Sequence, residues 1–120
     1  MSLINPSVGD LLDRLSILRL KIHHGSIAGR TVSHFEEERQ EILQRLPAGL
    51  DLNDPSVEHL FFINEMLWEL TDAMREAVEA KTAGLQARYG RVILRCNDKR
   101  AQLIRQIAQQ HGDARVEKIS

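Results

Sequence analysis

Several features that would indicate a disulfide-bonded, β-sheet or membrane protein are missing from this sequence. Its single cysteine, Cys96, excludes a disulfide within the chain, and only 4% of the residues are aromatic. The longest uninterrupted apolar run, residues 60–63, is far too short to cross a bilayer. No alternating runs of β-branched residues occur. These absences favour a helical chain with a mostly aliphatic core and no membrane insertion.

The sequence also lacks an excess of charge of either sign. The 120 residues carry a formal net charge of −1, so there is no electrostatic reason to expect nucleic acid as a partner. Asp10, Asp13 and Arg14 interrupt any apolar segment near the start, so a signal peptide is not expected. The five histidines lack the spacing of zinc ligands. A cytoplasmic protein is the simplest interpretation.

Apolar residues recur at helical spacing in four stretches, and local signals mark the expected helix ends. Ser7 is predicted to cap the first helix, which Gly25 should stop. Ser33 with Glu36 has the capping-box pattern for the start of a second helix, and Pro47 should end that helix.

The third and fourth stretches predict longer helices. Asp54 and the proline after it are a typical start for a third helix that runs to about Thr82. The apolar arc of this helix is wide enough to contact two neighbours. Gly84 should separate it from the last helix, which Gly112 can stop.

Together these signals predict an all-α fold. The length fits one domain spanning residues 1–120. We expect a small bundle of about four helices, with a long central third helix and a long last helix. Residues 113–120 are expected to form a tail.

Polar groups stand within or beside the apolar faces of these helices. Arg100 falls in the middle of the apolar face of the last helix, where a buried guanidinium needs a carboxylate or several carbonyls. The residues expected to form a polar network or a binding site are Asp10, Asp13, Lys21, Asn64, Trp68, Asp72, Arg75, Asn97, Asp98 and Arg100. Two interpretations remain open. One is a buried network that fixes helix register, and the other is a ligand pocket with a tryptophan wall.

Charged residues form a stripe on each of the two long helices. The acidic stripe of the third helix comprises Glu58, Glu65, Glu69, Asp72, Glu76 and Glu79. The basic stripe of the last helix comprises Arg88, Arg91, Arg95 and Lys99. The acids could hold a divalent cation or form a solvated face, and the two stripes could set the register of helix packing or of a homodimer.

Three segments carry a resemblance to a known family. They are Ser7-Val-Gly-Asp-Leu-Leu-Asp-Arg-Leu-Ser-Ile-Leu continuing to Lys21, Asn64-Glu-Met-Leu-Trp-Glu-Leu-Thr-Asp-Ala-Met-Arg75, and Cys96-Asn-Asp-Lys-Arg100, with Glu117-Lys118 in the tail. In this order they resemble an uncharacterised bacterial family catalogued as domain of unknown function 6165. The resemblance implies a small helical protein, often encoded among genes for surface polysaccharides, and supplies no activity. Thr71 departs from the family, which often has an acid there.

A second, thinner resemblance concerns acidic motifs. Glu38-Arg-Gln-Glu41 and Glu69-Leu-Thr-Asp72 are similar to the two motifs of MazG-type all-α nucleotide pyrophosphatases. In that class such acids bind Mg²⁺ and assist the attack of water on a nucleoside triphosphate. The resemblance implies that Glu38, Glu41, Glu69 and Asp72 would be the metal ligands.

Two functional hypotheses follow. The preferred one is a non-catalytic helical accessory or interaction protein without a cofactor. It would be a homo-oligomer, most simply a dimer, with a protein partner, and the resemblance links it to bacterial surface-polysaccharide synthesis. The alternative is a Mg²⁺-dependent pyrophosphohydrolase acting on a nucleotide or nucleotide sugar.

Overall fold

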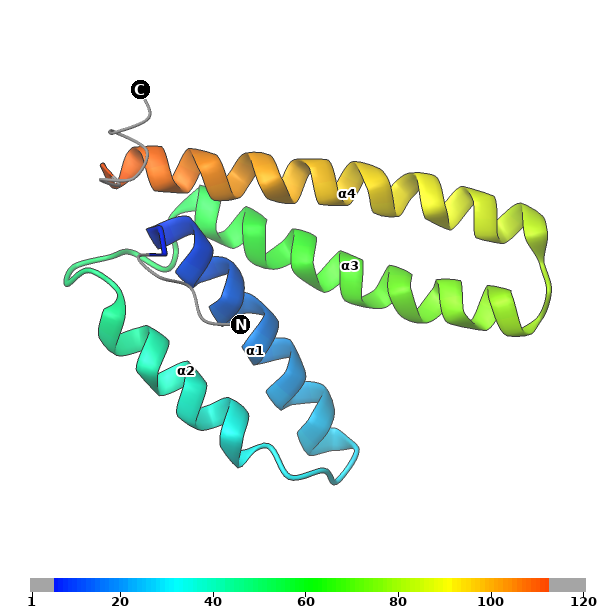
Figure 1. Ribbon diagram of the computed structural model, residues 1–120, viewed down its shortest axis with the longest axis horizontal. Coiled ribbons are helices and arrows are strands. Elements are labelled where there is room, and N and C mark those ends of the chain that lie inside the picture. The colour runs from blue at the N-terminus through cyan, green and yellow to red at the C-terminus, as the bar shows by residue number, and fades with distance from the viewer. Residues whose placement is uncertain (1–5, 113–120) are drawn as a thin grey trace.

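The computed structural model describes residues 6–112, which form four helices and no strands (Figure 1). The helices are α1 (Val8–Ile27), α2 (Ser33–Arg45), α3 (Pro55–Glu79) and α4 (Ala83–Gln110). The prediction of a small all-α bundle is confirmed, and α3 and α4 are the long helices, with 25 and 28 residues. The predicted tail, 113–120, lies outside the described residues.

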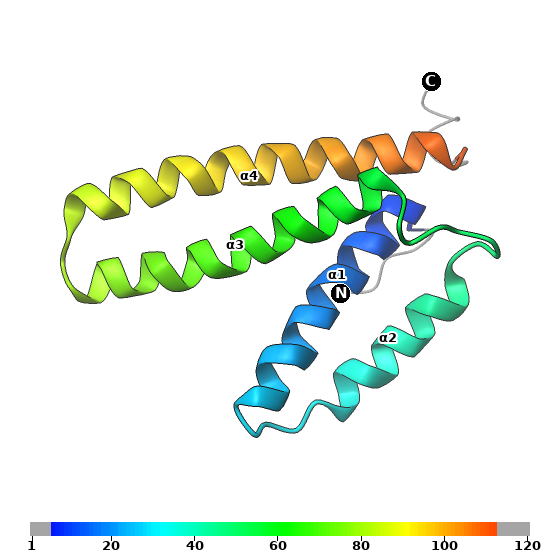
Figure 2. The ribbon, with the colours of Figure 1, turned by 180° about the vertical axis from the view of Figure 1, so that it is seen from behind.

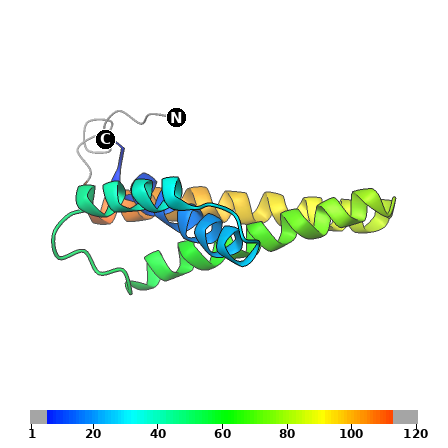
Figure 3. The same ribbon diagram turned by 90° about the horizontal axis from the view of Figure 1, so that it is seen from below.

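The helices form two antiparallel hairpins that meet near one end. α1 occupies the middle of the molecule and contacts α2, α3 and α4, while α2 packs mainly on α1 (Figures 1 and 2). The α3–α4 hairpin continues well beyond the α1–α2 hairpin (Figure 3). None of the described helices is both long enough and apolar enough to span a bilayer.

The core lies where α1 meets the α3–α4 hairpin. Leu12 and Leu18 of α1, Leu60 of α3 and Ile107 of α4 are fully buried there. These positions belong to the helical repeats read from the sequence, so each helix presents its apolar stripe to the others. Cys96 is buried in the same cluster, as expected for a small core residue.

Gly9 brings α1 unusually close to α4. A Cβ atom at this position would overlap the backbone carbonyl of Ile104. Glycine is therefore required here by the packing of two helix backbones, and not by a turn. No local sequence pattern indicated this contact.

Two predicted helix starts and two predicted stops are confirmed, and one of these stops is the end of α2 at Arg45, two residues before Pro47. The Ser7 hydroxyl accepts from the Asp10 amide at 2.9 Å, and the Asp10 carboxylate accepts from the Ser7 amide at 3.1 Å, which completes a capping box. Asp54 Oδ1 accepts from the Ser56 amide at 2.9 Å. Gly112, just after α4, has a φ of 59°, which glycine adopts without strain.

Other predicted ends were wrong. α1 runs past Gly25 to Ile27, and Gly29 takes the left-handed conformation with a φ of 72°. Gly25 instead leaves room for Val32, whose Cγ1 would lie 2.7 Å from an added Cβ. α2 begins at Ser33 itself, after an N-cap residue that makes no side-chain cap.

The break between the long helices also lies earlier than predicted. α3 ends at Glu79, and Lys81 takes a left-handed conformation with a φ of 56°. The Thr82 amide donates to the Ala77 carbonyl at 3.0 Å, so the last turn of α3 is closed by a Schellman-type bond. Gly84, the predicted break, falls inside the first turn of α4.

The outer part of the α3–α4 hairpin, residues 65–95, is thinly packed, and we call it the arm. Of these residues only Ala77 is buried. The radius of gyration is 16.2 Å. A compact chain of this length would have about 14 Å. The arm therefore makes the molecule elongated, with extents of 47 × 36 × 26 Å.

Candidate functional site

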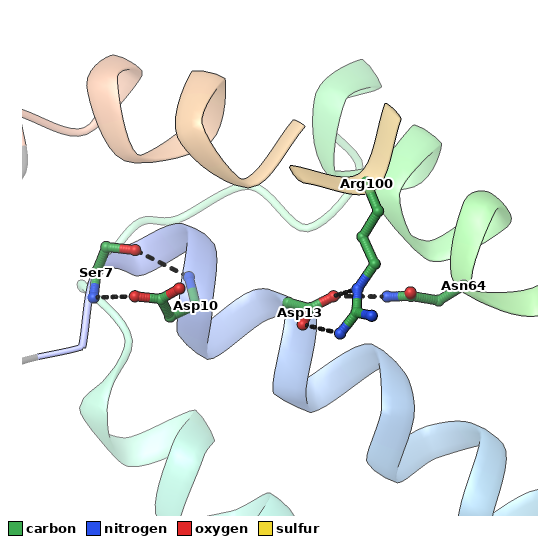
Figure 4. A network of polar contacts seen from close by, with 5 residues as sticks. All are labelled: Ser7, Asp10, Asp13, Asn64 and Arg100. Atoms are coloured by element: carbon green, nitrogen blue, oxygen red, sulfur yellow. Dashed lines mark hydrogen bonds and ion pairs between the residues drawn. The ribbon is translucent and has the colours of Figure 1, made fainter. Parts of the chain in front are cut away.

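Three polar side chains meet where α1, α3 and α4 come together (Figure 4). Arg100 of α4 donates to both oxygens of Asp13 on α1, from Nε to Oδ1 at 2.8 Å and from Nη2 to Oδ2 at 2.6 Å. Asn64 of α3 donates from Nδ2 to the same Oδ1 at 2.9 Å. Asp13 thus joins α1 to both long helices.

This junction is largely removed from solvent. Asn64 is 4% exposed, and the side chains of Asp13 and Arg100 are 13% and 31% exposed. The hydrogen bond that Arg100 donates to Asp13 raises the pKa of Arg100 above its ordinary value, against an opposing effect of burial. Among the described residues, no buried side-chain N or O atom lacks a partner. The junction has the geometry of the register-fixing network that the sequence suggested.

The other residues predicted for this network do not join it. Asp72 and Arg75 pair with each other at 3.1 Å on α3, with 55% and 66% of their side chains exposed. Asn97 and Asp98 are exposed on α4. The expectation of one hydrogen-bonded network was therefore wrong for Asp72, Arg75 and Asn97. Asp72 and Arg75 nevertheless line one cavity with Asn64, Trp68 and Arg100, as the pocket interpretation expected. α1 crosses the long helices beside Arg100, and Asp72 and Arg75 lie further out, in the outer part of the α3–α4 hairpin.

A first cavity, of about 510 Å³, lies between α1 and α2 on one side of the junction. Arg14 and Glu38, which both line it, form a bidentate pair: Arg14 donates from Nε to Oε2 at 3.1 Å and from Nη2 to Oε1 at 3.0 Å. Both side chains are a little over one third exposed. The pair links α2 to α1. An exposed ion pair of this kind contributes roughly 0–1 kcal/mol to the free energy of unfolding.

Two further cavities share several lining residues, and the smaller one is also lined by Asn64 and Arg100 of the junction. Their volumes are about 420 and 580 Å³. Both are lined by Arg30, Trp68, Asp72 and Arg75, so they form one continuous surface, which we call the Trp68 groove. Lys21, predicted from the sequence as a site residue, lines the larger cavity.

Aromatic rings line part of the Trp68 groove. Trp68 stacks on His24 of α1, with ring centroids 4.7 Å apart and planes inclined by 7°. The Lys21 ammonium lies 5.4 Å from the centroid of Phe35, which is within the range of a cation–π contact. The groove therefore combines flat apolar surfaces with cationic groups, as the pocket interpretation expected.

The acids of the metal-binding alternative are spread over the molecule. Glu38 and Glu41 line the first cavity, Asp72 lines the Trp68 groove, and Glu69 is exposed on α3. Within residues 6–112 there is no group of three or more His, Cys, Asp or Glu side chains that could hold a metal ion. One protomer therefore offers no Mg²⁺ site built from these four acids.

Sequence reasoning missed several residues of these sites. Arg30 follows the left-handed Gly29, and its amide donates to the Gly25 carbonyl at 2.8 Å, which fixes its backbone beside the groove. A glycine four residues after Gly25 was the available signal for this turn. His24 was considered only as a metal ligand. Nothing in the sequence paired Arg14 with Glu38.

Comparisons with known proteins give no assignment: no protein-family model, no curated protein and no solved structure matches this chain.

Proposed function

We propose that this protein is a non-catalytic helical interaction protein that works as a homodimer held together by its arms. The observation that carries the proposal is the single buried residue, Ala77, among residues 65–95. Two helices alone form a poor core, whereas four helices from two arms would enclose one. The large hydrophobic residues more than one third exposed on the arm are Val78, Leu85 and Leu94.

The charges of the arm favour a second copy of this chain as its occupant. The acids of the α3 stripe are exposed, as are Arg88, Arg91 and Arg95 on α4. Glu58 lies before the arm and Asp72 lines the Trp68 groove, so the stripe acids that a partner's arm would meet are Glu65, Glu69, Glu76 and Glu79. Within residues 6–112 the acids of α3 form no ion pair with the bases of α4. In a two-fold dimer, α3 of each protomer would face α4 of its partner, so each acidic stripe would meet a basic one.

Charge reversal tests this arrangement. One variant reverses the basic stripe by Arg88→Glu, Arg91→Glu and Arg95→Glu, and the other reverses the acidic stripe by Glu65→Lys, Glu69→Lys and Glu76→Lys. Each variant places like charges opposite each other in its own homodimer, so each should be monomeric by light scattering coupled to gel filtration. Mixed together, the two should form a heterodimer, because their charges are complementary again.

The matched control is Glu36→Lys with Glu37→Lys, which reverses exposed acids of α2 away from the arm. This control should remain a dimer. A monomeric wild-type protein at high concentration would refute the proposal, and so would charge-reversed variants that keep the wild-type mass.

The proposed setting comes from the resemblance to domain of unknown function 6165. The resemblance supports a role as an accessory to bacterial surface-polysaccharide synthesis, and we further propose a cytoplasmic location and a protein partner. No cofactor is part of this proposal. The Mg²⁺-dependent pyrophosphohydrolase would require Glu38, Glu41, Glu69 and Asp72 to meet across two chains, and no contact among the described residues favours that arrangement over the dimer proposed above.

A further inference from the structure

We propose that the Trp68 groove binds a phosphate-bearing small molecule. The larger of its two cavities is lined by three basic side chains, Lys21, Arg30 and Arg75, and by one carboxylate, Asp72. The groove thus has two positive charges in excess, although the whole chain has a net charge of −1. A concave surface that concentrates one sign of charge attracts ligands of the other sign.

Two of these cations are available to a ligand. Within residues 6–112, Lys21 and Arg30 form no ion pair with a carboxylate. Arg30 is held beside the groove by the backbone hydrogen bond from its own amide to Gly25, so its guanidinium starts from a fixed point. A guanidinium binds phosphate oxygens in a bidentate manner, and an ammonium adds a compact charge.

Asp72 holds the guanidinium of Arg75 in place through one hydrogen bond. Its Oδ1 accepts from Arg75 Nη1 at 3.1 Å, which leaves the other guanidinium nitrogen atoms without a carboxylate partner. One carboxylate does not neutralise the three cations, so the groove remains attractive to an anion with two or more charges. Phosphate esters and diphosphates have this charge, and a neutral sugar or an amine does not.

The stacked pair of Trp68 and His24 adds a flat apolar surface beside the cations. Such a surface suits an organic group attached to the phosphate, since rings gain dispersion energy against a flat wall. The shared chemistry of the proposed ligands is the phosphoryl anion. The experiment separates an organic phosphate from the inorganic ion.

Trp68 is the only tryptophan of the chain, so its fluorescence reports directly on this groove. The full-length protein is titrated with pyrophosphate and with adenosine diphosphate, each without metal. Saturable fluorescence changes are expected with both. Tighter binding of adenosine diphosphate would identify an organic phosphate as the preferred class, and equal binding would identify the inorganic anion.

Arg30→Gln and Lys21→Gln test the assigned cations. Loss of a charge-assisted hydrogen bond should raise the Kd of each variant roughly tenfold or more. The matched control is Arg105→Gln, which removes an exposed cation on α4 outside this groove and should leave the Kd unchanged. A fluorescence response that is absent at millimolar ligand, or that Arg105→Gln weakens as much as Arg30→Gln does, would overturn the proposal.

The outcome is separable from that of the dimer proposal. The residues that line the groove come from the four helices and the α1–α2 connection of one protomer, and Arg88, Arg91 and Arg95 are not among them. The monomeric charge-reversed variant Arg88→Glu, Arg91→Glu, Arg95→Glu should therefore bind pyrophosphate with the wild-type Kd. A dimer without binding would reject only the groove, and binding by a wild-type monomer would reject only the dimer.

Discussion

Asp13 accepts three hydrogen bonds from two other helices, and its loss would leave Arg100 partly buried without a carboxylate. The raised pKa of Arg100 means that its guanidinium is charged at any pH at which the protein is handled. A cation with a raised folded-state pKa contributes stability below its unfolded-state value, and that stability is lost only as the pH rises through the folded-state value.

Substitutions at this junction should therefore lower the free energy of unfolding. Asp13→Asn should lower the free energy of unfolding by about 1–3 kcal/mol, because it leaves a partly buried cation with a neutral partner. Arg100→Met should also destabilise, because it leaves Asp13 with Asn64 alone. The measurement is urea denaturation followed by circular dichroism. Glu38→Gln, at an exposed pair, is the control and should cost less than about 1 kcal/mol. Full stability of Arg100→Met would contradict the network.

The contact at Gly9 leads to a second residue-scale prediction. Gly9→Ala should destabilise the fold by about 1–3 kcal/mol or more, because the added methyl group forces α1 away from the α4 backbone. Gly90→Ala is the matched control. Its added Cβ would lie 3.7 Å from Met74 Cε, an ordinary contact, and helix propensity should stabilise it by about 0.5–1 kcal/mol. Thermal melts of both variants would compare the two directly, and equal shifts would contradict the close approach.

At the scale of elements, the arm should be the least stable part of an isolated chain. Its amides lie in helices with almost no buried neighbours, so they should open locally more often than those of the core. In the monomeric charge-reversed variant, hydrogen exchange across residues 70–95 should be faster than in wild type. Amides of residues 103–108 in α4 should exchange equally in both. Unchanged protection of the arm amides from exchange would mean that a partner chain does not stabilise the arm.

Helix starts and helix ends differed in how well they could be predicted. The starts at Ser7 and Asp54 depend on side chains that bind backbone amides within the next turn, so the sequence specifies them locally. The ends depend on packing. Gly25 was mistaken for a stop because nothing local shows that Val32 folds back against it.

At the scale of the whole molecule, the sequence predicted four helices but not how they cross. The crossing of α1 over α3 and α4 decides that Arg100 meets Asp13, and it leaves Asp72 and Arg75 outside the network. Apolar periodicity identifies which face of a helix packs against its neighbours. It does not show how far along the helix those neighbours extend. For the same reason the residues of the Trp68 groove were predicted only in part, since Arg30 and His24 reach it through the geometry of two hairpins.

The position of Cys96 has a practical consequence. It is the only thiol of the chain, it is 7% exposed, and it stands at the inner limit of the arm. A thiol reagent can reach it only when α4 separates locally from the helices packed against it. The rate at which the Cys96 thiol is chemically labelled therefore reports how often the protein opens locally at the base of its arm.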